Sequence, residues 1–142
     1  MTPDTTWPPD VAELIEDFAF LDGWEDRYMH VIDLGRAMEP LPEADRVDAN
    51  KVPGCASQVW LASTRGVDGH LVFRGDSDAH IVRGLVAIAT QVFSGRPDAA
   101  IRDLDHEALF AELGLSEHLS SQRANGLRSM VARIKREAGA AA

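Results

Sequence analysis

The sequence predicts an α+β fold, and three observations indicate it. Two amphipathic helical segments come first, one pair of strand-like segments joined by a turn follows, and helical segments fill the remainder. Helices on both sides of a single hairpin are typical of this class. The 142 residues suffice for one hydrophobic core, without repeats or an interior linker. We expect residues 1–9, rich in Pro and Thr, to be a flexible N-terminus and residues 10–142 to form a single domain.

Two helices are predicted before the strands. Asp10 followed by Glu13 is typical of an N-cap residue and its return partner. A second helix is expected to begin at Asp22, with Glu25 three residues later, and to end before the prolines within residues 40–42. The predicted buried faces are Val11, Leu14, Ile15 and Phe18 on the first helix, and Trp24, Tyr28, Val31 and Ile32 on the second.

A β-hairpin is predicted in the middle of the chain. Residues 57–65 alternate and contain β-forming side chains, with Val59 and Leu61 on one face. The segment "GVDG" at 66–69 is a turn signal, and residues 70–74 form the returning strand. A third strand is expected around residues 46–52.

A long buried helix is predicted after the hairpin. Asp76 or Ser77 is its expected N-cap, and the helix should run from Asp78 to Phe93. Because this segment is apolar almost all round, we expect it to be buried on most sides.

Shorter helices and one long helix complete the prediction. Pro97 suits the first turn of a short helix, and another should cover residues 106–113 with Gly114 as its C-terminal cap. Ser120 or Ser121 should cap the final helix. Its predicted buried stripe is Leu127, Met130, Val131 and Ile134.

Composition excludes several classes of function. The formal net charge is −9, from 23 acidic and 14 basic residues, which argues against nucleic acid as the main partner. No apolar run is long enough for a transmembrane helix, and the N-terminus lacks the pattern of a signal peptide, so we expect a cytoplasmic protein with no membrane partner. A single cysteine excludes an internal disulfide and a cysteine-only metal site in one chain.

Cys55 is that single cysteine, and its surroundings indicate more than packing. A lone free cysteine is most often a small buried hydrophobe. Here Pro53-Gly54 predicts a turn just before the thiol, and the thiol lies at the entrance to a strand rather than inside a periodic segment. Loops and strand ends often present functional side chains.

Thiol chemistry can be directed at carbon or at sulfur. Attack on carbon usually needs a nearby base and an oxyanion hole. No histidine forms a recognisable sequence pair with Cys55; the five are His30, His70, His80, His106 and His118. Attack on a disulfide or persulfide sulfur is a direct displacement, which a partner protein can activate. One thiol with no resolving cysteine therefore suits a sulfur carrier.

Three blocks of the sequence resemble the SufE family of cysteine desulfuration proteins. "GCASQVW" at 54–60 is similar to the family's Gly-Cys-x-Ser-x-Val-Trp signature. "GDSDAHIVRGL" at 75–85 resembles the second block and "LSEHLSSQRANGL" at 115–127 the third. Their order and separation also match, and the likeness covers roughly residues 10–137.

This resemblance implies a fold and a role. The implied fold is a small antiparallel sheet flanked by helices, similar to the IscU scaffold proteins. The implied role is that of a transpersulfurase, which accepts persulfide sulfur from a pyridoxal-phosphate cysteine desulfurase of the SufS type, stimulates it, and delivers sulfur to the SufB-containing SufBCD scaffold for iron–sulfur cluster assembly. The chain itself is expected to bind no cofactor, since pyridoxal phosphate belongs to the partner, and to carry sulfur rather than act as an enzyme.

Cys55 is the expected persulfide acceptor. Supporting or partner-contact residues are expected among Gly54, Ser57, Gln58, Asp76, Asp78 and Arg123. Purely structural roles are alternative interpretations: the two aspartates could serve as helix-cap and dipole residues, and Arg123 could be a solvated side chain. Three alternatives remain open: a companion of a different desulfurase with other sulfur acceptors, a stand-alone thiol hydrolase, and a non-catalytic interaction domain.

Overall fold

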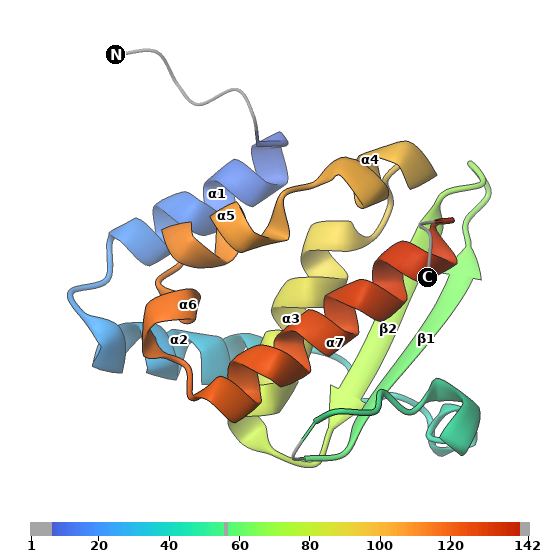
Figure 1. Ribbon diagram of the computed structural model, residues 1–142, viewed down its shortest axis with the longest axis horizontal. Coiled ribbons are helices and arrows are strands. Elements are labelled where there is room, and N and C mark those ends of the chain that lie inside the picture. Colours follow the sequence, from blue (N-terminus) through green and yellow to red (C-terminus); the bar gives the residue numbers. More distant parts are fainter. Residues whose placement is uncertain (1–6, 56, 140–142) are drawn as a thin grey trace.

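The chain adopts the predicted α+β fold in a computed structural model that describes residues 7–55 and 57–139. Figure 1 shows a two-stranded sheet with helices packed against it. In chain order the elements are α1 (Pro9–Ala19), α2 (Trp24–Ala37), the 3₁₀ turns η1 (Glu43–Asp45) and η2 (Asp48–Asn50), β1 (Val59–Arg65), β2 (Leu71–Ser77), α3 (His80–Phe93), α4 (Asp98–Asp103), α5 (His106–Glu112), α6 (Leu115–His118) and α7 (Ser121–Glu137).

The predicted flexible N-terminus falls largely outside the described residues. Residues 1–6 are not described, whereas Trp7 packs against the hydrophobic core and α1 already begins at Pro9.

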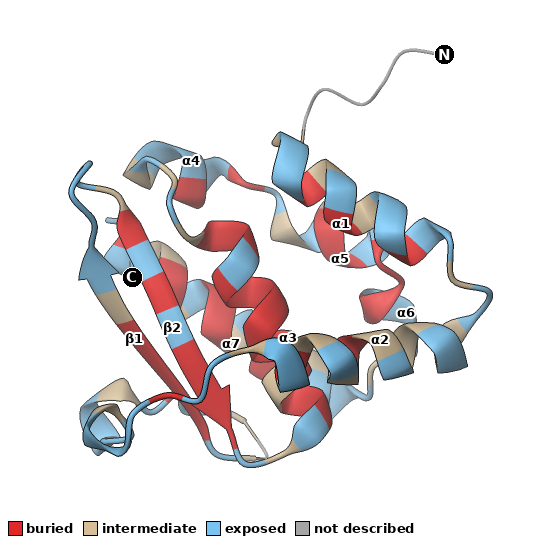
Figure 2. Cartoon of the chain, turned by 180° about the vertical axis from the view of Figure 1, so that it is seen from behind, coloured by how far each residue is buried: buried red, intermediate tan, exposed pale blue. Residues whose placement is uncertain are grey.

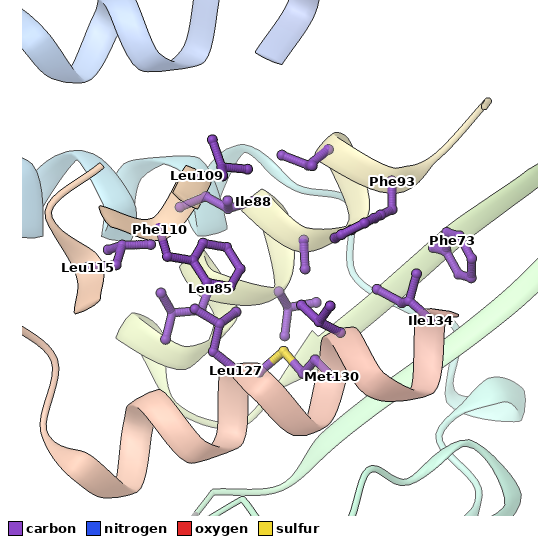
Figure 3. Close-up of a cluster of buried hydrophobic side chains, with 14 of the residues drawn as sticks. Phe73, Leu85, Ile88, Phe93, Leu109, Phe110, Leu115, Leu127, Met130 and Ile134 are labelled. Atoms are coloured by element: carbon purple, nitrogen blue, oxygen red, sulfur yellow. The ribbon is translucent and has the colours of Figure 1, made fainter. Parts of the chain in front are cut away.

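Helix α3 is the centre of the core, as its apolar sequence predicts. Eleven of its 14 residues are buried. It lies between α2 and α7 and also packs on β2 (Figures 1 and 2). Leu85, Ile88 and Phe93 of α3 meet Leu127, Met130 and Ile134 of α7 in the cluster that Figure 3 shows. The buried stripe expected on the final helix is thereby confirmed.

The α2–α3 crossing depends on two glycines. Gly35 and Gly84 are both buried, and a Cβ atom at Gly84 would collide with the carbonyl of Val31. A Cβ at Gly35 would lie 2.7 Å from the backbone nitrogen of Gly84. The two helices therefore approach main chain to main chain, which a residue with a side chain would prevent.

The hairpin is confirmed, with a longer second strand than predicted. β1 and β2 pair antiparallel from Val59↔Ser77 to Arg65↔Leu71. Val59 and Leu61 enter the main core, and Trp60 and Ala62 form a small second cluster with Leu41. The predicted third strand is wrong: the segment before Cys55 makes one isolated bridge, Lys51↔Trp60, after the η2 turn.

The helix starts predicted at Asp10, at Asp22 and at Asp76 or Ser77 are wrong, because the side chains have other partners or the backbone needs glycine. Helix α1 is capped at Pro8, α2 at Gly23 with φ of 94°, and α3 at Ala79, each without a side-chain cap bond. Asp10 instead pairs with Arg96 at 2.8 Å. The caps predicted at Ser120 and Gly114 are confirmed, since the Ser120 hydroxyl accepts the Arg123 N–H and Gly114 adopts φ of 79°.

Candidate functional site

Cys55 lies on a turn between η2 and β1, where the sequence places it. Gly54 has φ of 87°, a left-handed conformation that favours glycine, so the predicted Pro53-Gly54 turn is confirmed. The thiol is half-buried against α7, and its Sγ lies 3.7 Å from the carbonyl oxygen of Gly126. That distance suits a weak S–H donor bond. The cysteine is thus held by a helix 71 residues away in sequence.

A pocket of about 370 Å³ opens beside the thiol. Its wall combines apolar side chains of α3 and α7 with polar groups from the first turns of α7. The lining residues are Cys55, Ser57, Val82, Leu85, Ser120, Gln122, Arg123, Gly126 and Met130. Apolar side chains combined with a few polar groups are the usual composition of a binding site.

A second, more open hollow is lined by the cysteine loop itself and the residues that flank it. Its volume is about 520 Å³, and it is lined by residues 48, 51–55 and 57–59. Cys55 and Ser57 border both hollows. Among the described residues that line the two hollows, none is a histidine, and the one carboxylate is that of Asp48 in the second hollow.

Burial raises the pKa of the Cys55 thiol. Removing solvent disfavours the charged thiolate, and the carbonyl of Gly126 accepts a hydrogen bond only from the protonated form. The resting thiol is therefore more fully protonated at neutral pH than an exposed cysteine, and it is correspondingly less nucleophilic.

Asp78 ties the end of the cysteine loop to the start of α3. Its Oδ1 accepts the Gln58 N–H at 3.1 Å, and its own N–H donates to the Gln58 carbonyl at 3.3 Å. Gln58 and Asp78 are both exposed, so these reciprocal bonds lie at the surface beside the thiol. The structure thus brings two of the predicted supporting residues together with Cys55.

Asp76 lies in β2, is fully buried, and has an internal role. Its carboxylate pairs with Arg83 at 3.0 Å and with Arg46, and it accepts the Leu41 N–H at 3.0 Å. A carboxylate without exposed surface cannot touch a docked protein unless the fold rearranges. Burial therefore argues against the contact role predicted for Asp76, whereas the same role for the exposed Asp78 stays a prediction.

Arg123 is exposed and lines the pocket at the start of α7, and Ser57 borders both hollows. Sequence reasoning missed Gly126, whose position inside a predicted helix was the available signal. It also missed Arg133, whose guanidinium donates to the main-chain carbonyls of Ala49 and Lys51 ahead of the cysteine and which no sequence pattern connects with Cys55.

The chain matches the model of the SufE domain, described as an Fe–S metabolism associated domain, over residues 12–138. It belongs to the SufE family. It is 57% identical over 129 residues to an uncharacterized SufE-like protein of Rhizobium meliloti (strain 1021), across 89% of this chain and 92% of the relative. It is 56% identical over 129 residues to an uncharacterized SufE-like protein of Rhizobium etli, across 89% and 87%.

A solved structure shares the SufE fold seen here. The solution structure of a hypothetical protein from Thermus thermophilus matches with a TM-score of 0.76 over 94% of this chain and 96% of that one. Its sequence identity is 18%, so the likeness shows the fold alone.

Family membership supports a sulfur-transfer role with a cysteine desulfurase. Among the helices in residues 7–55 and 57–139, none is long and apolar enough to cross a membrane. In the same part of the chain, no three side chains of His, Cys, Asp or Glu gather as a metal site would require.

Proposed function

We propose that this SufE-family chain carries sulfur as a transient persulfide on Cys55. The observation that carries the proposal is the position of the thiol: it is the chain's single cysteine, on a glycine turn at the edge of a pocket with both apolar and polar walls. The donor is a pyridoxal-phosphate cysteine desulfurase of the SufS type, and the chain itself holds no cofactor.

The transfer is one displacement at sulfur. The Cys55 thiolate attacks the terminal sulfur of the persulfide on the desulfurase cysteine, a new S–S bond forms on Cys55, and the old S–S bond breaks. The desulfurase cysteine leaves as a thiolate and takes up a proton. No oxidant or reductant is needed, because the sulfane sulfur moves without a net change in oxidation state. Removing this sulfur frees the desulfurase for another turnover, which accounts for the stimulation.

The thiol is activated in the complex with the desulfurase. At rest burial favours the protonated thiol, and none of the described residues that line the two hollows is a histidine. Docking would expose Cys55 to the partner's site, where a base or a cation can favour the thiolate. Asp78 and Arg123, both exposed beside the loop, are the proposed contact residues.

A thiolate of the SufB-containing scaffold of the SufBCD complex then attacks the terminal sulfur of the Cys55 persulfide, a new S–S bond forms on the scaffold, and Cys55 leaves as a thiolate, so that the sulfur becomes available for iron–sulfur cluster assembly. A related proposal replaces the two partners by a different desulfurase and other acceptors. Both versions assign the same chemistry to Cys55, so co-purification with the cognate desulfurase separates them.

The test is intact-mass measurement after the protein is mixed with the cognate desulfurase and cysteine. The proposal predicts a gain of one sulfur atom, located on Cys55 by peptide mapping and absent when either the desulfurase or cysteine is omitted. No added sulfur on Cys55, although the desulfurase turns over in the same tube, would contradict it. Ester hydrolysis by the chain alone would instead favour a thiol hydrolase.

A further inference from the structure

One face of α7 holds the cysteine segment, and it lies beside the buried apolar stripe of that helix. Gly126, Ser129 and Arg133 follow the i, i+3, i+7 spacing that places residues on one side of a helix. Each of them contacts a different part of residues 49–55. We call these three residues the loop seat.

Gly126 is the part of the loop seat that meets the thiol. It is buried, and a Cβ atom there would lie 3.3 Å from Cys55 Sγ and 3.7 Å from both Cα and Cβ of Cys55. Glycine is a poor helix former, so its place in the middle of a 17-residue helix needs a reason. The space taken by Cys55 supplies that reason.

Ser129 and Arg133 hold the chain before the thiol. A Cβ at Gly54 would lie 3.0 Å from Ser129 Oγ, so the turn also rests on α7. Arg133 donates from Nη1 to the Lys51 carbonyl at 3.1 Å and from Nη2 to the Ala49 carbonyl at 2.9 Å. A guanidinium that bonds two main-chain oxygens of one segment fixes the approach of that segment to the turn.

We propose that Gly126, Ser129 and Arg133 are positioning residues that set how far Cys55 is withdrawn from solvent and hence how readily it reacts. The inference deepens the carrier role and rests on it for its meaning in sulfur transfer. The contacts themselves can be tested on the free protein, without any desulfurase.

The first test substitutes Gly126→Ala. The methyl group must push the cysteine side chain away by a few tenths of an ångström, because the thiol is on a loop whereas the glycine is inside a regular helix. We expect iodoacetamide to alkylate Cys55 at least about threefold faster than in the wild type, since local opening governs the reaction of a protected group. The pH at which the rate is half-maximal should fall, because the displaced thiol regains solvent.

Global stability separates displacement from damage. Alanine is the better helix former, so the melting temperature of Gly126→Ala should stay within about 3 °C of the wild type. Faster alkylation with retained stability and an acid-shifted pH profile supports the proposal. An unchanged or slower rate, or an unchanged pH profile, would overturn the assignment of Gly126.

The second test uses Arg133→Gln with Arg136→Gln as its matched control. Both changes remove one positive charge from the last turns of α7, but Arg136 is exposed and, within the described residues, makes no hydrogen bond to the cysteine segment. We expect faster hydrogen exchange at residues 51–55 and faster alkylation only for Arg133→Gln. Arg133→Lys, which keeps the charge but cannot bond both carbonyls in the same way, should fall between. Equal behaviour of the two glutamine variants would refute a role for Arg133.

These outcomes are independent of the proposed function. If the free protein behaves as expected but gains no sulfur from the desulfurase, the loop seat stands and the carrier role fails. If sulfur is gained normally while Gly126→Ala and Arg133→Gln leave the thiol unaltered, the carrier role stands and the loop seat fails.

Discussion

The α2–α3 crossing and the cysteine loop both bring chain segments together at a glycine, yet their neighbours differ. At the crossing, a Cβ on Gly84 would meet main-chain atoms of Val31 within a helix. At the loop seat, a Cβ on Gly126 would meet the side chain of Cys55 on a turn. Helical backbone is fixed by its own hydrogen bonds, whereas a half-buried loop can shift. A close approach at a glycine therefore fixes the packing of two helices at the crossing, whereas at the loop seat it positions a reactive group that can move.

Cys55→Ser gives the largest expected functional effect and should leave the fold intact. A hydroxyl is too weak a nucleophile to replace a thiolate, and the chain has no other cysteine. Sulfur acceptance and stimulation of the desulfurase should both be lost, while the unfolding transition in urea stays at the same denaturant concentration. Sulfide release at the wild-type rate with this variant would contradict the carrier role and leave the loop without its proposed purpose.

Gly84→Ala, at the α2–α3 crossing, should instead lower the stability of the fold. The added methyl group cannot be accommodated without moving α2 away from α3, so we expect a loss of about 3 kcal/mol in the free energy of unfolding, as overpacked cores show. Urea denaturation measures it. Gly66→Ala is the control, because Gly66 lies in the exposed hairpin turn and should change stability little. A Gly84→Ala variant as stable as the control would remove the contrast between the two glycines.

The sequence predicted the core better than the ends of its elements. Uninterrupted apolar spacing identified α3 and the stripe on α7, since those patterns depend on neighbours within one helix. The caps expected at Asp10 and Asp76 failed because each carboxylate pairs with an arginine elsewhere in the chain, Arg96 for the first and Arg83 for the second. Local rules cannot see such partners. The four-residue helix α6 was missed because it is too short to show a period.

The candidate site was likewise predicted only in part. Pro53-Gly54 predicted a turn at Cys55, and the family blocks pointed to Arg123, which lines the pocket. The contact between Cys55 and Gly126 joins residues 71 positions apart, and no spacing within either segment indicates it. Folding brings them together, so the structure was needed to show that the thiol meets Gly126.

Asp78→Ala should have a smaller effect on stability, confined to the loop. Removing the carboxylate deletes its bond from the Gln58 N–H, an exposed interaction that contributes about 1 kcal/mol or less. Hydrogen exchange at Gln58 should become faster, and the global unfolding free energy should hardly change. Asp76→Asn is the informative comparison, since weakening a fully buried carboxylate with two arginine partners should cost much more. Similar stability losses for the two variants would show that Asp78 supports the core and not only the loop.

The subtlest effect is the pH dependence of the resting thiol. Burial raises the pKa of Cys55, so at any pH below that value the folded protein contains less thiolate than its unfolded chain. Alkylation of the native protein should therefore be slower than that of the urea-unfolded chain near neutral pH, and its rate should rise over a higher pH range. By linkage, the stabilisation from the buried neutral thiol is fully present below the pKa of the unfolded chain and is lost as the pH rises through the higher pKa of the folded state. Cys55→Ser should remove this alkaline loss while Gly126→Ala should reduce it. Native and unfolded chains that alkylate with the same rate and the same pH profile would show that α7 does not protect the thiol. The α2–α3 crossing and the cysteine loop would then differ only in how tightly their glycines are packed.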